Sequence, residues 1–368
     1  MIYFDHNATT AIDERVVETM LPYLKTFYGN PSSLYRAGRI VRSAVNTARE
    51  QVAALVDAQP EQIVFTSGGT EANNLALHTI SPHATVVISS IEHPSISEPA
   101  NNHKKLNLFS LAVDHNGLVI TEVIEKLLRE SHPVDFISIM LANNEQGAIQ
   151  NIAELSKQYR DKCSVIHTDA VQAVGKIPVS FRQLDVDLMS LSSHKIYGPK
   201  GCGALIVNKK MDISPLLIGG GQENGWRAGT ENVAAIVGFG KAAELAQLEL
   251  EQHHAHCLAL RNTLENELHT IPGLVIFAEQ AERLPNTVQF GIKGMDGEML
   301  LMQLDQKNIA VSSGSACSSG AGKASSVLTA MGIDYQLAKS AIRISLGKSN
   351  TEQDVKVFIQ TLKKFLNL

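Results

Sequence analysis

The 368-residue sequence has few cysteines and no excess of positive charge, and each shortage excludes a class of protein. Its four cysteines show no short paired spacing, which favours reduced thiols in a cytosol over a disulfide framework. The formal net charge is −5. The charge therefore gives no indication of a basic surface that would bind nucleic acid. It also gives no indication of a polybasic segment that would contact an anionic membrane.

Long hydrophobic runs are also missing. No apolar run approaches the roughly 20 residues that a membrane span requires. The N-terminus lacks the charged segment followed by an apolar one that is typical of a signal peptide. With 44% apolar and 19% charged residues, the composition is ordinary for a globular protein. We therefore expect a cytoplasmic enzyme that does not contact a membrane.

Predicted strands and helices alternate through most of the chain, which indicates an α/β fold. Continuous apolar strands of this kind favour a mainly parallel sheet covered by helices on both faces. These strands are expected at 63–66, 85–90, 135–141, 164–168, 188–191 and 203–207. Later in the chain the pattern changes to a smaller α+β unit, with strands expected at 287–292, 309–312 and 342–346. We expect a large domain over 13–250 and a small domain made of 1–12 and 251–368.

The stretch Ser192-Ser193-His194-Lys195 follows a short predicted strand and leads into Gly-Pro-Lys-Gly, which cannot continue that strand. A lysine at the mouth of a buried strand can be partly desolvated, so that its neutral amine is available to attack an electrophile. A solvated lysine in a turn is the alternative that this stretch alone leaves open.

Other polar residues also follow predicted strands. Gly69 and Thr70 lie between a strand and a helix, where backbone N–H groups and a hydroxyl can hold a phosphate. This segment lacks the Gly-Lys-Ser/Thr of a Walker A loop, and a plain strand-to-helix turn remains an alternative. Strand ends are where α/β sheets bind ligands. The further candidates there are His93, Asn144, Asp169 and Gln172.

Two segments contain cysteine in unusual surroundings. The segment 312–323 consists almost entirely of small residues around Cys317, which predicts a mobile, exposed loop with a reactive thiol. The segment 253–257 contains three histidines and Cys257. A zinc site is one interpretation of this segment, and a solvated helix is the other. The solvated helix is favoured because these neighbours do not share one helix face.

Eight motifs occur in one order along the chain, and together they resemble the cysteine desulfurases of the class V aminotransferase family. The resemblance runs from Tyr3 to about Leu346 and includes the long cysteine loop of one group of these enzymes. It implies the fold type I of transferases that use pyridoxal 5'-phosphate (PLP), and a homodimer with shared sites. The motifs are Ser-Gly-Gly-Thr-Glu, Glu-His-Pro, Asn-Asn-Glu-Gln-Gly, Asp-Ala-Val-Gln, Ser-Ser-His-Lys-Ile-Tyr-Gly-Pro-Lys-Gly, Arg-Ala-Gly-Thr, Ser-Ser-Gly-Ser-Ala-Cys and Ile-Arg-Ile-Ser-Leu-Gly.

The resemblance also implies roles for individual residues. Lys195 binds the aldehyde of PLP, Asp169 keeps the pyridine nitrogen protonated, and His93 stacks on the ring and acts as an acid or base. Arg343 binds the substrate carboxylate, with Asn30 close by. Thr230 reaches the cofactor phosphate of the neighbouring subunit. The remaining cofactor contacts that the resemblance implies are Gly69, Thr70, Asn144, Gln172, Ser192 and His194.

The implied reaction converts L-cysteine to L-alanine and leaves the sulfur as a persulfide on Cys317. The sulfur then passes to acceptors for iron–sulfur cluster, thio-cofactor or tRNA synthesis. An iron–sulfur scaffold is one expected partner, although the short C-terminus puts its docking in doubt. No metal site is expected, apart from contact of Cys317 with a cluster on a partner.

Three other functions remain open at this point. A selenocysteine lyase or an aminotransferase of the same fold would share most of the motifs, although an aminotransferase has no use for Cys317 in a mobile loop. A non-catalytic scaffold is the third alternative. It predicts losses among Lys195, Asp169, His93 and Cys317, yet all four residues are present.

Overall fold

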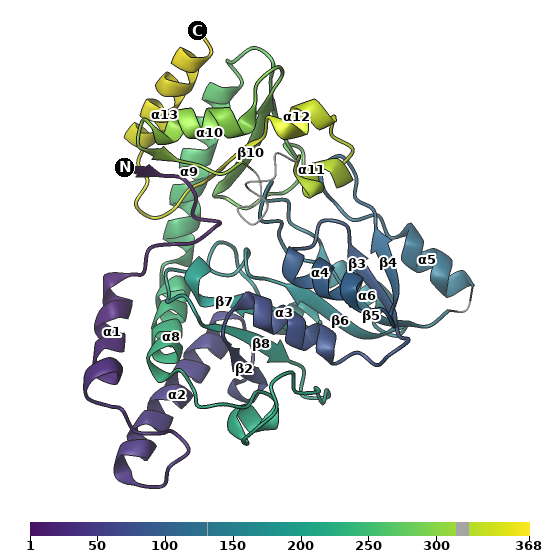
Figure 1. Ribbon diagram of the computed structural model, residues 1–368, viewed down its shortest axis with the longest axis vertical. Helices are drawn as coiled ribbons and strands as arrows, with labels where there is room; N and C mark the ends of the chain where they lie inside the picture. The colour runs from purple at the N-terminus through teal and green to yellow at the C-terminus, as the bar shows by residue number, and fades with distance from the viewer. Residues whose placement is uncertain (131, 314–323) are drawn as a thin grey trace.

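The computed structural model describes residues 1–130, 132–313 and 324–368, which form a larger and a smaller lobe (Figure 1). The larger lobe is built on a seven-stranded sheet. Its strands are β2 (Ile63–Thr66), β3 (Thr85–Ser89), β4 (Asn107–Leu111), β5 (Val134–Ser138), β6 (Cys163–Asp169), β7 (Leu188–Ser192) and β8 (Gly203–Val207).

The sheet has the order β2-β8-β7-β6-β5-β3-β4. All neighbours from β4 to β7 are parallel, and only β8 runs antiparallel to the strands on either side of it. The expected mainly parallel α/β sheet is therefore confirmed. Strand β4 was not predicted, because it lies at the sheet edge and most of its side chains are exposed.

Helices cover both faces of this sheet. One face packs against α3 (Gly69–His78) and α4 (Pro94–Asn102), and Val64 of β2 belongs to that core. The next residue, Phe65, points to the opposite core, which includes residues of α2, α6, α7 and α8. No described helix has both the length and the apolar character that a membrane crossing needs. The larger lobe also contains α1 (Glu14–Lys25), α2 (Arg36–Leu55), η1 (Pro60–Gln62), α5 (Glu122–Arg129), α6 (Ile152–Tyr159), α7 (Phe181–Leu184), η3 (Gln222–Gly225) and α8 (Val233–Leu248).

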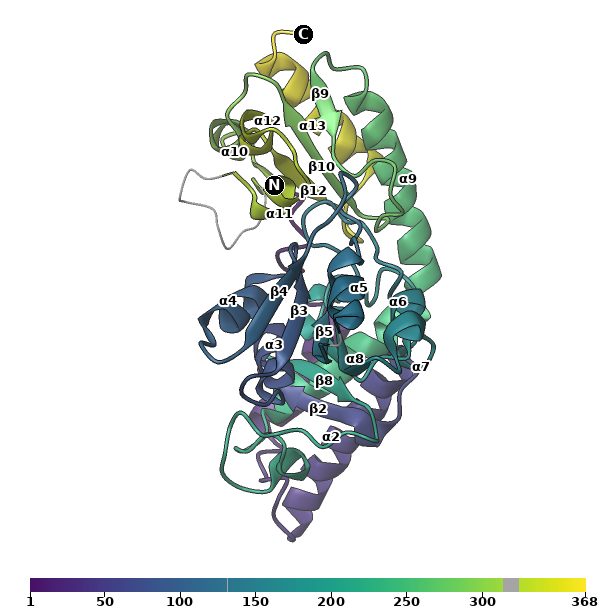
Figure 2. The ribbon, with the colours of Figure 1, turned by 90° about the vertical axis from the view of Figure 1, so that its right-hand side faces the viewer.

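The smaller lobe has its own core. A three-stranded antiparallel sheet of β9 (Leu274–Ile276), β10 (Thr287–Ile292) and β12 (Ile342–Ser345) packs against helices. Helix α9 (Leu250–Leu268) continues the chain from α8 into this lobe (Figure 2). The remaining elements are β1 (Ile2–Tyr3), α10 (Gly297–Asp305), β11 (Ile309–Ala310), α11 (Ser326–Ala330), α12 (Tyr335–Lys339) and α13 (Glu352–Phe365).

The first residues of the chain pack with the last third. Strand β1 pairs with β11, and Phe4 lies in the core of the smaller lobe. This packing supports the division that we propose, with a large domain over 13–250 and a small domain made of 1–12 and 251–368.

Helix α1 is capped by a side chain and is only partly buried. The carboxylate of Asp13 accepts a hydrogen bond from the backbone N–H of Arg15 and so caps the helix. Val16 is fully buried, whereas Leu24 and Phe27 remain 64% and 38% exposed. The outer part of α1 therefore presents an apolar surface in the single chain.

The histidine-rich segment of α9 is not a fully solvated helix face, so that expectation is wrong in part. His253 and Cys257 are buried, and the ring of His253 packs edge-on against Tyr197 and approaches the carbonyl of Gly175 at 3.2 Å. Within the described ranges, no three histidine, cysteine or acidic side chains gather closely enough to hold a metal ion. Cys163 and Cys202 are likewise buried and free.

His167 in the centre of β6 should make the fold sensitive to acid. Its two ring nitrogens lie 2.9 Å and 3.0 Å from the hydroxyls of Ser138 and Ser190, and burial lowers its pKa to about 3. Below the usual value of 6.5, the unfolded chain binds a proton at this position that the folded chain does not. His167 therefore removes stability as the pH falls from 6.5 toward 3.

Urea unfolding of wild type and His167→Asn at several pH values checks this expectation. Between pH 6 and 4.5, wild type should lose about 1.4 kcal/mol more per pH unit than the variant. The variant itself should be less stable at pH 7, because asparagine fills the space incompletely. Parallel pH curves for the two proteins would contradict the assignment.

Candidate active site

A cavity of about 240 Å³ opens at the carboxyl ends of the sheet strands. Parallel strands end at one edge of a sheet, so side chains that follow them in sequence meet there. The structure brings nine of the predicted site residues together in the cavity wall: Gly69, Thr70, His93, Asn144, Asp169, Gln172, Ser192, His194 and Lys195.

Lys195 lies at the end of η2 (Ser193–Lys195), a single turn that follows β7 directly. Its Nζ donates hydrogen bonds to the carbonyl oxygens of Asn7 at 2.5 Å and Ala8 at 2.8 Å. The N-terminal arm therefore contacts the amine inside the cavity, which a solvated lysine in a turn would not show.

Asp169 is the last residue of β6, and both of its carboxylate oxygens are held. One accepts a hydrogen bond from the side chain of Asn73 at 2.7 Å, and the other from the backbone N–H of Val171 at 2.9 Å. Two donors fix the orientation of the carboxylate.

A second acid lies behind the cavity wall. Glu92 is buried, and one of its oxygens accepts hydrogen bonds from Ser89 and from the backbone of Met140. Burial, supported by the negative charge of Asp169, raises the pKa of Glu92 to about 8. At neutral pH Glu92 is therefore mostly protonated.

His93 precedes α4 and caps it with its own ring. The backbone N–H of Ser95 donates to His93 Nδ1 at 3.1 Å, so the proton of the neutral ring is on Nε2. Burial and the positive charge of Lys195 lower the pKa of His93, although Asp169 opposes them. The site thus contains a neutral imidazole with a fixed tautomer.

One end of the cavity has hydrogen-bond donors without protein acceptors. Helix α3 begins at Gly69 with no side-chain cap, so its first N–H groups remain available. The buried hydroxyl of Ser192 has no hydrogen-bond partner within the described residues. A Cβ on Gly69 would lie 3.0 Å from the side chain of Val171, so a larger residue would narrow this end. These features fit a bound anion.

His194 borders the same end of the cavity. Its Nδ1 lies 3.1 Å from the hydroxyl of Thr9. Burial, together with the charges of Lys195 and Lys200, lowers the pKa of His194 to about 4. His194 is therefore neutral at physiological pH and can act as a hydrogen-bond donor to an anion.

Arg343 lies beside the cavity but does not line it. Its side chain is 2% exposed, pairs with Asp5 at 2.6 Å and donates to the carbonyl of Asn144 at 3.0 Å. Arg343 Nε has no acceptor among the described residues. The predicted carboxylate-binding side chain thus keeps one unused donor next to the site.

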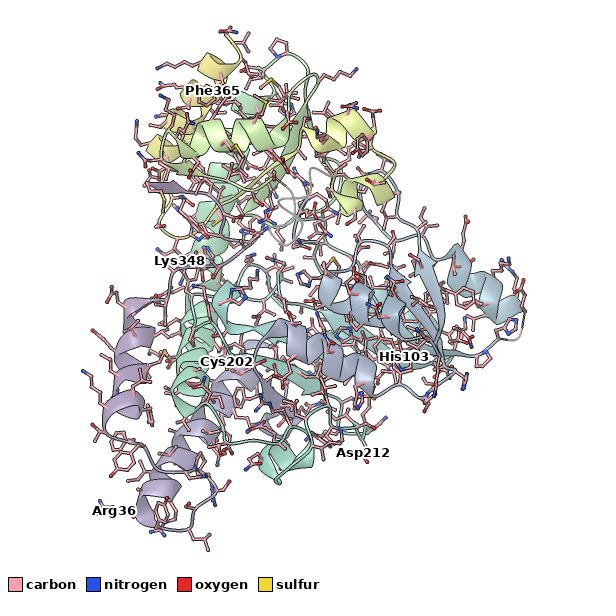
Figure 3. The ribbon with its side chains drawn as sticks, viewed as in Figure 1. Arg36, His103, Cys202, Asp212, Lys348 and Phe365 are labelled. Atoms are coloured by element: carbon pink, nitrogen blue, oxygen red, sulfur yellow. The ribbon has the colours of Figure 1, made fainter. Side chains whose placement is uncertain are left out.

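Two predicted residues do not reach the cavity within one chain. Asn30 lies in the loop before α2, and Arg36 at the start of α2 is at the end of the molecule away from the small lobe (Figure 3). Thr230 is exposed and lines a separate recess together with Arg227. Cys317 lies outside the described residues. The described Ser312, five positions earlier, exchanges backbone hydrogen bonds with Arg343.

Several site residues were missed by the sequence analysis. Asn73 and Ser95 orient Asp169 and His93, and Asn7 accepts from Lys195. The sequence does not show that Asn7 belongs to the site, because its partners there lie more than 130 positions away.

Comparison with known proteins decides the family. The model for aminotransferase class-V matches residues 2–358. The chain belongs to this family. It is 42% identical to a cysteine desulfurase IscS of Dictyoglomus turgidum, over 99% of this chain and 94% of the relative. The cysteine desulfurase IscS of Methanosarcina thermophila is 40% identical, over 99% of this chain and 92% of that protein.

Solved structures agree with this assignment. A NifS-like protein from Rickettsia africae superposes with a TM-score of 0.92 at 38% identity, over 100% of both chains. A structure of SspA in complex with cysteine has a TM-score of 0.81 at 29% identity, over 95% of this chain and 100% of that one. Within the class V aminotransferases, the chain is therefore a cysteine desulfurase with the fold type I of PLP enzymes.

The cavity fits PLP, the cofactor of this family. The uncapped start of α3 and the unpartnered hydroxyl of Ser192 offer donors for its phosphate. Asp169 offers a fixed carboxylate for the pyridine nitrogen, and Lys195 places an amine in the same cavity for the aldehyde. The groups suited to the phosphate, the pyridine nitrogen and the aldehyde thus line one cavity, as binding of a single ligand requires.

Proposed function

We propose that this desulfurase takes sulfur from L-cysteine, releases L-alanine and holds the sulfur as a persulfide on Cys317. The observation that carries the proposal is the meeting of Lys195, Asp169 and His93 in a cavity whose other end offers anion donors. Full-length similarity to cysteine desulfurases supports it.

Each residue of the cavity has a separate role in this proposal. When bound, PLP withdraws electrons from the α-carbon of an amino acid. Lys195 removes the α-proton, for which its amine must be neutral, and Asp169 holds the positive charge of the pyridine nitrogen. His93 would face the cofactor ring, and its Nε2 could move a proton. The groups assigned to the phosphate are Gly69, Thr70, Ser192 and His194, and those assigned to the phenolate side are Asn144 and Gln172.

Sulfur transfer is a displacement at the substrate sulfur. The thiolate of Cys317 attacks that sulfur, an S–S bond forms and the C–S bond breaks. The electron pair of the C–S bond stays on the β-carbon of the substrate, which takes up a proton, and Lys195 returns the α-proton, so that alanine results. Arg343, whose Nε has no acceptor among the described residues, is assigned to the substrate carboxylate.

An absorption spectrum before and after L-cysteine, with alanine and sulfide assayed in the same tube, tests the proposal. A band near roughly 400 nm that shifts, with both products formed together, supports it. A protein that PLP cannot colour overturns it. A coloured protein that makes no alanine points to an aminotransferase, and strong preference for selenocysteine points to a selenocysteine lyase.

Asp169→Asn should lower kcat/KM for alanine formation by about 100-fold or more. An amide cannot hold the charge of the pyridine nitrogen, and its NH2 group would face the donors of Asn73 and Val171. Steady-state kinetics on the PLP-loaded protein measures the effect. Asp135→Asn is the matched control, because Asp135 caps the N–H of Thr85 away from the cavity. Equal losses in both variants would contradict the role of Asp169.

A homodimer with shared sites is part of the proposal. The exposed Thr230 would reach the phosphate of a neighbouring subunit, and Asn30 would need a second copy to approach substrate. Large apolar side chains remain exposed on the first two helices, the loop between them and the segment before Thr230, which supports burial by a second copy. They include Leu24, Tyr28, Leu34, Tyr35 and Ile218.

The acceptors are proposed to be proteins of iron–sulfur cluster, thio-cofactor or tRNA-thiolation pathways, and an iron–sulfur scaffold is one of them. Three buried, free cysteines fit a reducing compartment, which supports the cytoplasm as the location.

A further inference from the structure

Lys176 is a buried lysine that the catalytic roles above do not use. It is 3% exposed and lies one turn beyond Gln172 in sequence. Its Nζ donates to Gln172 Oε1 at 2.7 Å and to Asn7 Oδ1 at 2.8 Å. In the part of the chain that the structure describes, Lys176 forms no ion pair with a carboxylate. A buried amine held only by neutral oxygens is costly, so its presence calls for a role.

These two contacts fix the orientation of two amides. An ammonium group donates and cannot accept, so the oxygens of Gln172 and Asn7 must face it. The NH2 groups then point the other way. Burial lowers the pKa of Lys176, and although a neutral amine can also accept, its two N–H groups still suit the two oxygens that lie 2.7 Å and 2.8 Å from Nζ.

Both amide NH2 groups reach elements of the site. Gln172 Nε2 donates to the carbonyl of Asn7 at 2.9 Å, the same carbonyl that accepts from Lys195. Asn7 Nδ2 donates to the carbonyl of Asn144 at 3.2 Å and to the hydroxyl of Thr287 in the small lobe at 2.9 Å. Lys176 thus joins two amides of the wall behind the cavity, and Asn286 Nδ2 also donates to Asn7 Oδ1 at 3.1 Å.

We propose that Lys176 is a positioning residue, which holds Gln172 with its NH2 group toward the phenolate side of PLP. The inference rests on the proposed function. Without Lys176, the amide of Gln172 can turn by 180° and present its oxygen to the phenolate. Two oxygens that face each other repel, and cofactor affinity falls.

A double-mutant cycle on cofactor affinity tests this role. The PLP-free forms of wild type, Lys176→Met, Gln172→Ala and the double variant are titrated with PLP, and the Kd is measured by equilibrium dialysis. Lys176→Met and Gln172→Ala should each weaken binding by about tenfold, the effect of one hydrogen bond. The double variant should bind no more weakly than either single variant, because Lys176 acts through Gln172.

Lys348→Met is the matched control. Lys348 lies between the lobes (Figure 3), pairs with Glu249 and packs over the ring of Tyr197, but it contacts neither Gln172 nor Asn7. Its PLP affinity should stay within twofold of wild type. Thermal unfolding of each PLP-free protein separates loss of stability from loss of cofactor affinity.

If Lys176→Met does not fold, the PLP affinity of Lys176→Gln is measured in its place. An amide at this position both donates and accepts, so it no longer dictates which way Gln172 faces, and PLP binding should weaken several-fold. Wild-type affinity in the folded variant, or additive losses in the cycle, would overturn the inference and leave the proposed function intact. Failure of wild type to bind PLP would instead overturn the proposed function.

Discussion

Replacing Lys195 by alanine should lower the rate of alanine and sulfide formation by about 10⁴-fold or more. The described residues that line the cavity contain no other amine that could replace it. The hydrogen bonds to Asn7 and Ala8 hold the amine where the cofactor and the substrate α-carbon must meet. Loss of this side chain removes both the covalent attachment of PLP and the base that takes the α-proton.

Two measurements separate these effects. Single-turnover assays with excess PLP report the chemistry, and reduction with borohydride followed by mass spectrometry reports whether PLP is joined to the protein at residue 195. Lys209→Ala, at an exposed position after β8, is the control and should behave as wild type in both. Turnover of Lys195→Ala within tenfold of wild type would show that another group is the base.

The placement of Lys195, Asp169 and His93 in one cavity could be predicted from the sequence for a physical reason. Each of these residues lies at or just after the carboxyl end of a strand: Asp169 ends β6, Lys195 follows β7 and His93 follows β3. The carboxyl ends of parallel strands lie at one edge of the sheet, independent of the conformation of the loops. The expected order of strands and polar residues was therefore enough to place them in one cavity. The unpartnered hydroxyl of Ser192 could not be read from the sequence, because it depends on which neighbours approach it.

The residues that support this wall were not predictable in the same way. Asn7, Asn73 and Lys176 act through hydrogen bonds to groups far away in sequence, and an amide or a lysine in a polar segment has no distinctive pattern. The extent to which α1 is buried could not be predicted from its apolar periodicity either. A helical period shows that one face is apolar, but not whether the same chain or a second copy covers it. Leu24 shows the difference.

Cys317→Ser should abolish transfer of sulfur from L-cysteine and lower sulfide formation by at least about 100-fold. A serine hydroxyl is almost never ionised near neutral pH, whereas a thiol is partly thiolate and intrinsically more nucleophilic. Position 317 is close enough in sequence to act on substrate. Ser312 is bonded to the backbone of Arg343, and five residues can span at most roughly 17 Å from there.

Mass spectrometry after alkylation should find one added sulfur on the peptide that contains Cys317 in wild type and none in the variant. Cys163→Ser is the matched control, because Cys163 is buried and its thiol donates to the carbonyl of Val165, a bond that a hydroxyl can also make. The control should keep wild-type activity. If Cys317→Ser releases sulfide at the wild-type rate, Cys317 is not the group that takes the sulfur from the substrate.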